Sequence, residues 1–237
     1  MTVVINLVSL IFVCFNLYIQ AQNVVIVVVD GARYSETFGA INPSQYIPHL
    51  WNDLKPLGTL YTNFRIATEG QTVTNPGHAT IATGTWQIIS NAGGEFPHKP
   101  TIFEYFRKEL GASQYDNYMI AGKSKLEYIK HSDYEGYGNT YGATWSGNDN
   151  HNDLSVYNLI VGAMDTDNPR LIIVNFPEVD TKGHLGVWDD YLAAIVNVDD
   201  LIYQLWMKIQ TDNFYKDNTT LFITNDHGRH DDAHGGF

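Results

Sequence analysis

The chain has 237 residues, of which 44% are hydrophobic and 17% are charged, a composition that suits one large globular domain. Its formal net charge is -12 and it has no run of lysine or arginine, which argues against a nucleic-acid backbone as a partner. An acidic protein that faces an anionic substrate needs a local positive group such as a metal ion, and nine histidines make such a site worth searching for.

The chain opens with an apolar segment that reads as a secretory signal. The segment from Val3 to Ile19 is almost entirely apolar, and Ala21 offers a small residue for cleavage, so we expect residues 1–21 to be a signal peptide and residues 22–237 to form the mature domain. The expected location is secreted or periplasmic. A membrane anchor is the alternative, because about 20 apolar residues can span a bilayer. Cys14, the single cysteine, lies in this segment, so cleavage would leave no thiolate ligand or disulfide.

The first strand follows directly. Residues 24–29 (VVIVVV) are β-branched throughout and are followed by Asp30 and Gly31. A continuous apolar run of this length fits a strand that is buried on both faces, as in a parallel sheet covered by helices. Residues 59–64 (TLYTNF) give a weaker strand pattern. Asp-Gly after a strand is also ordinary turn chemistry, so Asp30 by itself does not identify a site.

Two helices are expected in the next part of the chain. Pro76 and Gly77 suit a sharp turn that opens a helix at His78, and the N-terminus of that helix would favour an anion. Residues 101–110 (TIFEYFRKEL) begin with a capping threonine, carry a glutamate three residues later and stop at Gly111. Both features are typical of helix ends.

The second half of the chain repeats the alternation of strand and helix. Residues 171–176 and 220–224 are further strong strand candidates, and residues 118–121 are a weaker one. Apolar residues at three- and four-residue spacing predict a long helix over 188–205. The segment 127–151 has no such period and is interpreted as a long loop or small insertion. The pattern predicts an α/β fold with a doubly wound, mainly parallel sheet and helices on both faces.

Acidic residues and histidines follow each of the three strong strands. Asp30 follows the first, Asp180 and His184 come shortly after the second, and Asp226 and His227 follow the third. Taken singly, these motifs also fit a turn, a surface pair or a helix cap. In open α/β sheets, however, ligands bind beyond the carboxyl ends of the strands, so the fold would gather all five residues at one edge. Carboxylates and imidazoles bind zinc and similar ions, and five ligands exceed the need of one tetrahedral ion, so we expect two.

The stretch 72–84 (TVTNPGHATIATG) is dense in hydroxyl groups and contains Thr74. A hydroxyl is a poor nucleophile until a base or a metal ion activates it, and two neighbouring divalent ions can do this. The charges of two such ions balance those of three carboxylates and one alkoxide. A neutral centre of this kind can accept a phosphate group that a bare acidic surface would repel.

Four motifs in this order resemble the alkaline phosphatase superfamily: VVVDGAR, TVTNPGHATIATG, DTKGH and NDHG. The resemblance runs from about Asn23 to the C-terminus, and it looks closest to the type I phosphodiesterase/nucleotide pyrophosphatase branch. There the nucleophile stands two residues before the proline of a Thr-x-Pro-x-His motif, which implies Thr74 as nucleophile. The resemblance also implies that Asn91 holds a phosphoryl oxygen. It implies one ion held by Asp30, Thr74, Asp226 and His227, and another held by Asp180, His184 and a third histidine.

The third histidine lies well downstream of Asp-His-Gly in that family and is followed by further sheet. Here ten residues follow His227, and among them His230 and His234 are the candidates. We therefore expect an alkaline-phosphatase-like domain that is C-terminally incomplete. The alternative is a degenerate member of the family with one weak metal site.

The sequence thus predicts a metal-dependent hydrolase of phosphate mono- or diesters that works through a phospho-Thr74 intermediate. Its cofactors would be two zinc ions, with manganese or magnesium as alternatives, and its partner a small-molecule phosphate ester. We expect no nucleic-acid surface, and no membrane contact unless the N-terminal segment stays uncleaved. One rival hypothesis is a catalytically inactive or fragmentary member that binds a metal or ligand, and another is a one-metal binding module with a structural role.

Sulfatase-like or mutase-like chemistry on the same fold is a further alternative. Sulfatases carry a different motif, in which a cysteine or serine is oxidised to formylglycine and is followed by x-Pro-x-Arg. Here Thr74 stands at that position, and His78 stands where the arginine would be. Phosphoglycerate and phosphopentose mutases share the metal ligands, although an exported protein favours hydrolysis over mutase chemistry.

Overall fold

The computed structural model of the chain describes residues 23–62, 64, 70 and 72–229. The expected signal peptide and both C-terminal histidine candidates, His230 and His234, lie outside these residues. No helix in the described part of the chain combines the length and the apolar character that crossing a membrane requires.

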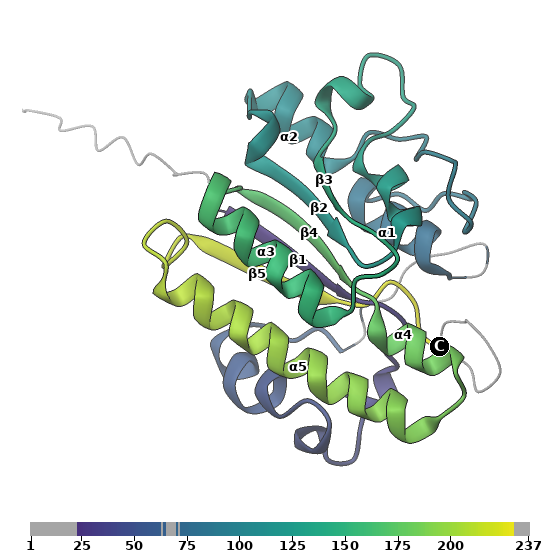
Figure 1. The fold of residues 1–237 in the computed structure, drawn as a ribbon, viewed down its shortest axis with the longest axis vertical. Helices are drawn as coiled ribbons and strands as arrows, with labels where there is room; N and C mark the ends of the chain where they lie inside the picture. The colour runs from purple at the N-terminus through teal and green to yellow at the C-terminus, as the bar shows by residue number, and fades with distance from the viewer. Residues whose placement is uncertain (1–22, 63, 65–69, 71, 230–237) are drawn as a thin grey trace, which may run out of the picture.

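A five-stranded parallel sheet forms the centre of the molecule (Figure 1). Its strands stand in the order β3-β2-β4-β1-β5. Val24 on β1 lies opposite Leu171 on β4 and Thr220 on β5, so these three strands run in register and end at the same edge of the sheet. The strands are β1 (Asn23–Val29), β2 (Asn117–Ala121), β3 (Thr144–Gly147), β4 (Leu171–Phe176) and β5 (Thr219–Thr224).

Helices cover both faces of this sheet, which confirms the doubly wound α/β fold (Figure 1). Successive side chains of a strand point to opposite faces, so β1 divides between two cores. Val27 packs with α3 and α5 on one face, and Val28 packs with α1 and α2 on the other. The helices are α1 (Thr74–Thr83), α2 (Ile102–Leu110), α3 (Asp153–Asp167), α4 (Glu178–His184) and α5 (Trp188–Thr211).

Most of the expected elements form as the sequence predicts. The four strand candidates at 24–29, 118–121, 171–176 and 220–224 are all strands. Helix α2 has the expected ends, because Thr101 and Glu104 form a reciprocal capping box and Gly111 closes the helix in a left-handed conformation. The predicted long helix is α5, which continues to Thr211.

Two expectations were wrong, and a third segment has more regular structure than a loop. The described residues of 59–64 form no strand, and Tyr61 and Phe64 are exposed there, so the pattern reflects surface residues and not a core strand. The segment 127–151, expected to be a long loop or a small insertion, is not one continuous loop, because it contributes strand β3 and short 3-10 helices. β5 is not buried on both faces: it is an edge strand, and the side chain of Phe222 is 54% exposed.

Candidate metal centre

The carboxyl edge of the sheet gathers the acidic residues that the sequence singled out. Asp30 follows β1, Asp226 and His227 follow β5, and Asp180 lies in α4 directly beyond β4. Because β4, β1 and β5 are neighbours in the sheet, their ends lie side by side. The paired residues are distant in the sequence: Val24 on β1 and Leu171 on β4 are 147 positions apart (171 − 24). The three aspartates are nearly inaccessible to solvent, with exposures of 0% for Asp30, 1% for Asp226 and 3% for Asp180.

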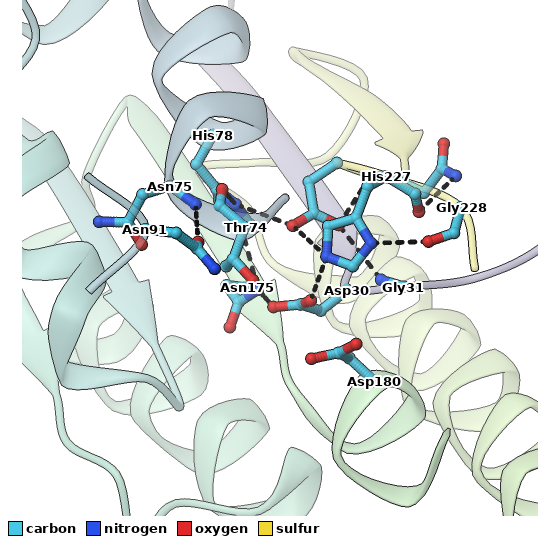
Figure 2. Close-up of polar contacts among 12 residues, drawn as sticks. Asp30, Gly31, Thr74, Asn75, His78, Asn91, Asn175, Asp180, His227 and Gly228 are labelled. Atoms are coloured by element: carbon cyan, nitrogen blue, oxygen red, sulfur yellow. Dashed lines mark hydrogen bonds and ion pairs between the residues drawn. The ribbon is translucent and has the colours of Figure 1, made fainter. Parts of the chain in front are cut away.

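Asp30, Asp226 and His227 form a compact set of possible metal ligands. One ligand atom of each lies within 4.8 Å of the others. Nε2 of His227 is 3.3 Å from Oδ1 of Asp30 and 3.5 Å from Oδ2 of Asp226, and the imidazole faces the Asp30 carboxylate in Figure 2. Both oxygens are buried, and the groups that face them are imidazole nitrogens: Nε2 of His227 for both, and Nδ1 of His78, 3.2 Å away, for Asp226. Two such oxygens and one imidazole nitrogen suit a divalent ion of the zinc type.

Electrostatic interactions favour the ionised form of Asp30, the form in which a carboxylate binds a metal ion. Burial alone would raise the pKa of Asp30, but the hydrogen bond with His227 and the charge of Lys123 together hold it well below its usual range. Burial lowers the pKa of His227, but the charges of Asp226 and Asp30 outweigh it and raise this pKa to about 9. Binding of an ion by Nε2 of His227 at neutral pH would therefore require this imidazole to lose a proton.

Helix α1 brings Thr74 to this centre. Thr74 is the first residue of α1, and its hydroxyl oxygen is buried without a hydrogen-bond partner among the described residues. Nδ1 of His78 lies 2.8 Å from the backbone oxygen of Thr74 and 3.2 Å from Oδ2 of Asp226, so it ties the first turn of α1 to the ligand set. Gly77 permits this approach, since a Cβ there would stand 2.5 Å from the backbone oxygen of Asp226.

The second expected ligand pair lies beside the first. Nε2 of His184 is 3.3 Å from Oδ1 of Asp180, one helical turn apart on α4. Gly31 allows Asp180 to lie close to the end of β1, because a Cβ at Gly31 would stand 2.9 Å from two Asp180 atoms. The third histidine that the resemblance implies falls outside the described residues. Within them, this half of the centre contributes two ligands, and Asp30, Asp226 and His227 fit a full site better.

Asn91, which the resemblance implies as a holder of a phosphoryl oxygen, contacts the N-terminus of α1. Its side-chain oxygen accepts a hydrogen bond of 3.0 Å from the backbone N–H of Asn75 and another of 3.2 Å from Nζ of Lys125. The side-chain amide of Asn75 in turn donates to the backbone oxygen of Lys125 over 3.1 Å. Asn91 is therefore fixed beside Thr74 through its side-chain oxygen.

Sequence reasoning missed three residues of this centre. Lys123 places Nζ 2.8 Å from Asp30 and 2.6 Å from Asp180, and Lys125 follows two residues later. Both lysines lie beyond the carboxyl end of β2. An inspection of the polar residues that follow this weaker strand, as was made for the three strong strands, could have found them. Asn175 donates to Asp30 over 2.8 Å, and its signal was a single polar residue in an otherwise apolar strand.

Comparison with known proteins agrees with this geometry. The sequence model of the metalloenzyme superfamily matches residues 22–235. The chain belongs to this superfamily.

Among curated relatives, a segment of 71 residues is 32% identical to the 2,3-bisphosphoglycerate-independent phosphoglycerate mutase of Gracilaria tenuistipitata var. liui. That segment covers 30% of this chain and 13% of the algal protein. A segment of 79 residues is likewise 32% identical to the enzyme of the same name from Clostridium beijerinckii, and this match covers 32% of this chain and 14% of that protein. The matched segments thus span a small part of the curated relatives.

Proposed function

We propose that this superfamily member is a metal-dependent phosphoryl-transfer enzyme that hydrolyses phosphate esters through a covalent phospho-Thr74 intermediate. The observation that carries the proposal is the position of the Thr74 hydroxyl. It is buried and has no hydrogen-bond partner in the described structure, it opens helix α1, and it adjoins the ligand set of Asp30, Asp226 and His227. A hydroxyl kept in this state is available to a metal ion and to a substrate.

The reaction divides into two displacements. Oγ1 of Thr74 attacks phosphorus, the bond from phosphorus to the ester oxygen breaks, and the proton of Thr74 ends on the released alcohol. Water then attacks the same phosphorus, which releases phosphate and restores the hydroxyl. When bound, divalent ions lower the pKa of attacking oxygens and stabilise the charge that develops on the leaving oxygen. Asn91 and the N-terminus of α1 hold the phosphoryl oxygens through N–H donors.

The charge of the site supports a monoester in preference to a diester. A phosphate monoester carries roughly 1.5 to 2 negative charges at neutral pH, whereas a diester carries only one. Lys123 and Lys125 both lie at the centre, so they add positive charge beyond that of any bound ion. Extra cations favour the more highly charged phosphoryl group.

A hydrolysis screen tests this proposal. We expect p-nitrophenyl phosphate to be cleaved faster than bis-p-nitrophenyl phosphate with zinc present, and neither to be cleaved with a chelator. Thr74→Ala should lower kcat by about three orders of magnitude or more, while Thr74→Ser keeps a hydroxyl and much of the rate. Turnover by Thr74→Ala at the wild-type rate, or unchanged turnover with a chelator, would contradict the proposal.

Mutase chemistry is the second candidate, because both curated relatives above are named phosphoglycerate mutases. The first displacement is then the same, but the phosphoryl group passes from Thr74 to another hydroxyl of the same alcohol and not to water. Incubation with 3-phosphoglycerate separates the two. Formation of 2-phosphoglycerate supports the mutase, and release of inorganic phosphate supports the hydrolase.

A further inference from the structure

Lys123 joins the two halves of the candidate metal centre. Its ammonium nitrogen lies 2.8 Å from Oδ2 of Asp30 and 2.6 Å from Oδ2 of Asp180, and its side chain is 15% exposed. The lysine reaches this place because Gly122 before it packs against Pro177, directly before α4; a Cβ at Gly122 would stand 2.4 Å from Cγ of Pro177. The contact is thus built by the close packing of the ends of β2 and β4.

The two oxygens of each carboxylate face different groups, and the arrangement is the same in Asp30 and Asp180. In both Asp30 and Asp180, Oδ2 faces Lys123, whereas Oδ1 faces a histidine that the resemblance implies as a ligand. For Asp30 that histidine is His227, at 3.3 Å, and for Asp180 it is His184, also at 3.3 Å. Lys123 therefore contacts the oxygens that point away from the histidines. It does not contact the Oδ1 atoms, of which that of Asp180 also lies 3.5 Å from Nη1 of Arg229.

Without ions, this centre buries three carboxylates at the end of one sheet. Buried charges of like sign repel strongly, and they destabilise a fold unless cations pair with them. Lys123 offsets this repulsion from one atom that contacts two of the three carboxylates. Once divalent ions bind, they supply the compensating charge themselves, and the nearby ammonium then opposes them.

We propose that Lys123 is an internal counter-cation of the metal-free centre, alongside Arg229 at Asp180: it helps to keep the ligand cluster folded, and it does so at a cost in metal affinity. The proposal rests on Asp30 and Asp180 being metal ligands, as the proposed function has them, but it does not depend on which reaction the centre performs. Lys123 is in this respect a positioning residue, which acts through the two aspartates.

Zinc binding and thermal unfolding of the full chain test the proposal without measuring turnover. Lys123→Met keeps most of the side-chain volume and removes the charge. We expect this variant to unfold several degrees lower than the wild type in a chelator, to regain most of the difference in saturating zinc, and to bind zinc at least ten-fold more tightly by calorimetry. Lys125→Met is the matched control. It removes the same charge from a lysine two residues further along the chain, whose ammonium contacts Asn91. Both its effects should be smaller.

Three results would overturn the proposal. Equal losses of thermal stability with and without zinc would make Lys123 an ordinary structural ion pair. Weaker zinc binding by Lys123→Met would show that the lysine orients the ligands and does not compete with the ions. A wild-type chain that binds no zinc or manganese would remove the ligand assignment, and the proposed hydrolase with it, whereas the first two results leave that function standing.

Discussion

Asn175 donates a hydrogen bond of 2.8 Å from its side-chain amide to Oδ2 of Asp30, from within a strand whose other residues are all apolar. Asn175 lies opposite Val28 in the sheet and is fully buried. A polar side chain at such a position is costly unless it is hydrogen-bonded, and here its partner is the central carboxylate of the candidate metal centre. The bond fixes the carboxylate so that Oδ1 faces His227.

Replacing Asn175 with leucine therefore should weaken metal binding. Groups that orient metal ligands in this way typically contribute 10- to 100-fold to affinity, so we expect Asn175→Leu to raise the dissociation constant for zinc by about that factor. Asn117→Leu is the matched control. It removes a buried asparagine from the neighbouring strand β2, at the opposite end of the sheet, and it should leave zinc affinity unchanged. Equal zinc affinity of the two variants would contradict the role of Asn175.

A substitution of Asn91 can test phosphoryl binding by the side-chain nitrogen separately from the structural role of the side-chain oxygen. In Asn91→Asp the oxygen still accepts from the N–H of Asn75, but the amide donor is lost and a negative charge faces the phosphoryl group. Loss of one such donor typically costs about 100-fold in rate, so we expect kcat/KM to fall by roughly that factor or more. Thermal stability should stay close to that of the wild type. A stability loss that accounts for the lost activity would point to a purely structural asparagine.

Glu104 anchors the segment that follows β2, and its substitution should destabilise the fold. Its buried carboxylate accepts five hydrogen bonds: from the N–H and hydroxyl of Thr101, from the N–H and hydroxyl of Ser132, and from the N–H of Gly138. Glutamine can accept at one oxygen only, and its amide would face donors. We expect Glu104→Gln to lower the free energy of unfolding by about 3 kcal/mol or more, measured by urea denaturation.

The control for Glu104 stands on the same helix. Glu109 is exposed on α2, where it accepts one hydrogen bond from the hydroxyl of Tyr137. Glu109→Gln should change the free energy of unfolding by no more than about 0.5 kcal/mol. If the two variants lost similar amounts of unfolding free energy, the buried hydrogen bonds of Glu104 would not contribute the stability that we assign to them.

Asp153 should make stability depend on pH. Its carboxylate accepts a hydrogen bond from the N–H of Glu178, but burial dominates and raises its pKa to about 8. In the unfolded chain this pKa is about 4, so between about pH 4 and pH 8 the folded protein holds a proton that the unfolded chain has lost. This group therefore lowers stability as pH rises through that window. Asp153→Asn removes the titrating group and keeps an oxygen acceptor.

Urea denaturation of both proteins at several pH values measures this effect. The variant should gain stability relative to the wild type as pH rises from 4 to about 8, because the other titrating groups are common to both proteins. A constant difference across that window would show that Asp153 is ionised in the folded state at neutral pH.

The sequence by itself determined the features that local chemistry encodes. Continuous β-branched runs gave buried parallel strands, and the reciprocal pairing of Thr101 with Glu104 set the start of α2. The rule that parallel strands share a carboxyl edge was enough to bring Asp30, Asp180 and Asp226 together. This general topological rule was sufficient to predict that the three residues lie together, because each of them follows a strand with a strong sequence signal.

Only the tertiary structure decided the remaining parts. Strand β3 has no apolar run of its own and forms by pairing with β2 at the sheet edge. The packing role of Gly77 and Gly122 has no local signal in the sequence, since it depends on backbone and side-chain atoms that approach from distant segments. Lys123 is one of several lysines in the sequence, and only close packing of β2 against the end of β4 places it between two carboxylates. Contacts of this kind depend on long-range packing, which the identity of neighbouring residues does not encode.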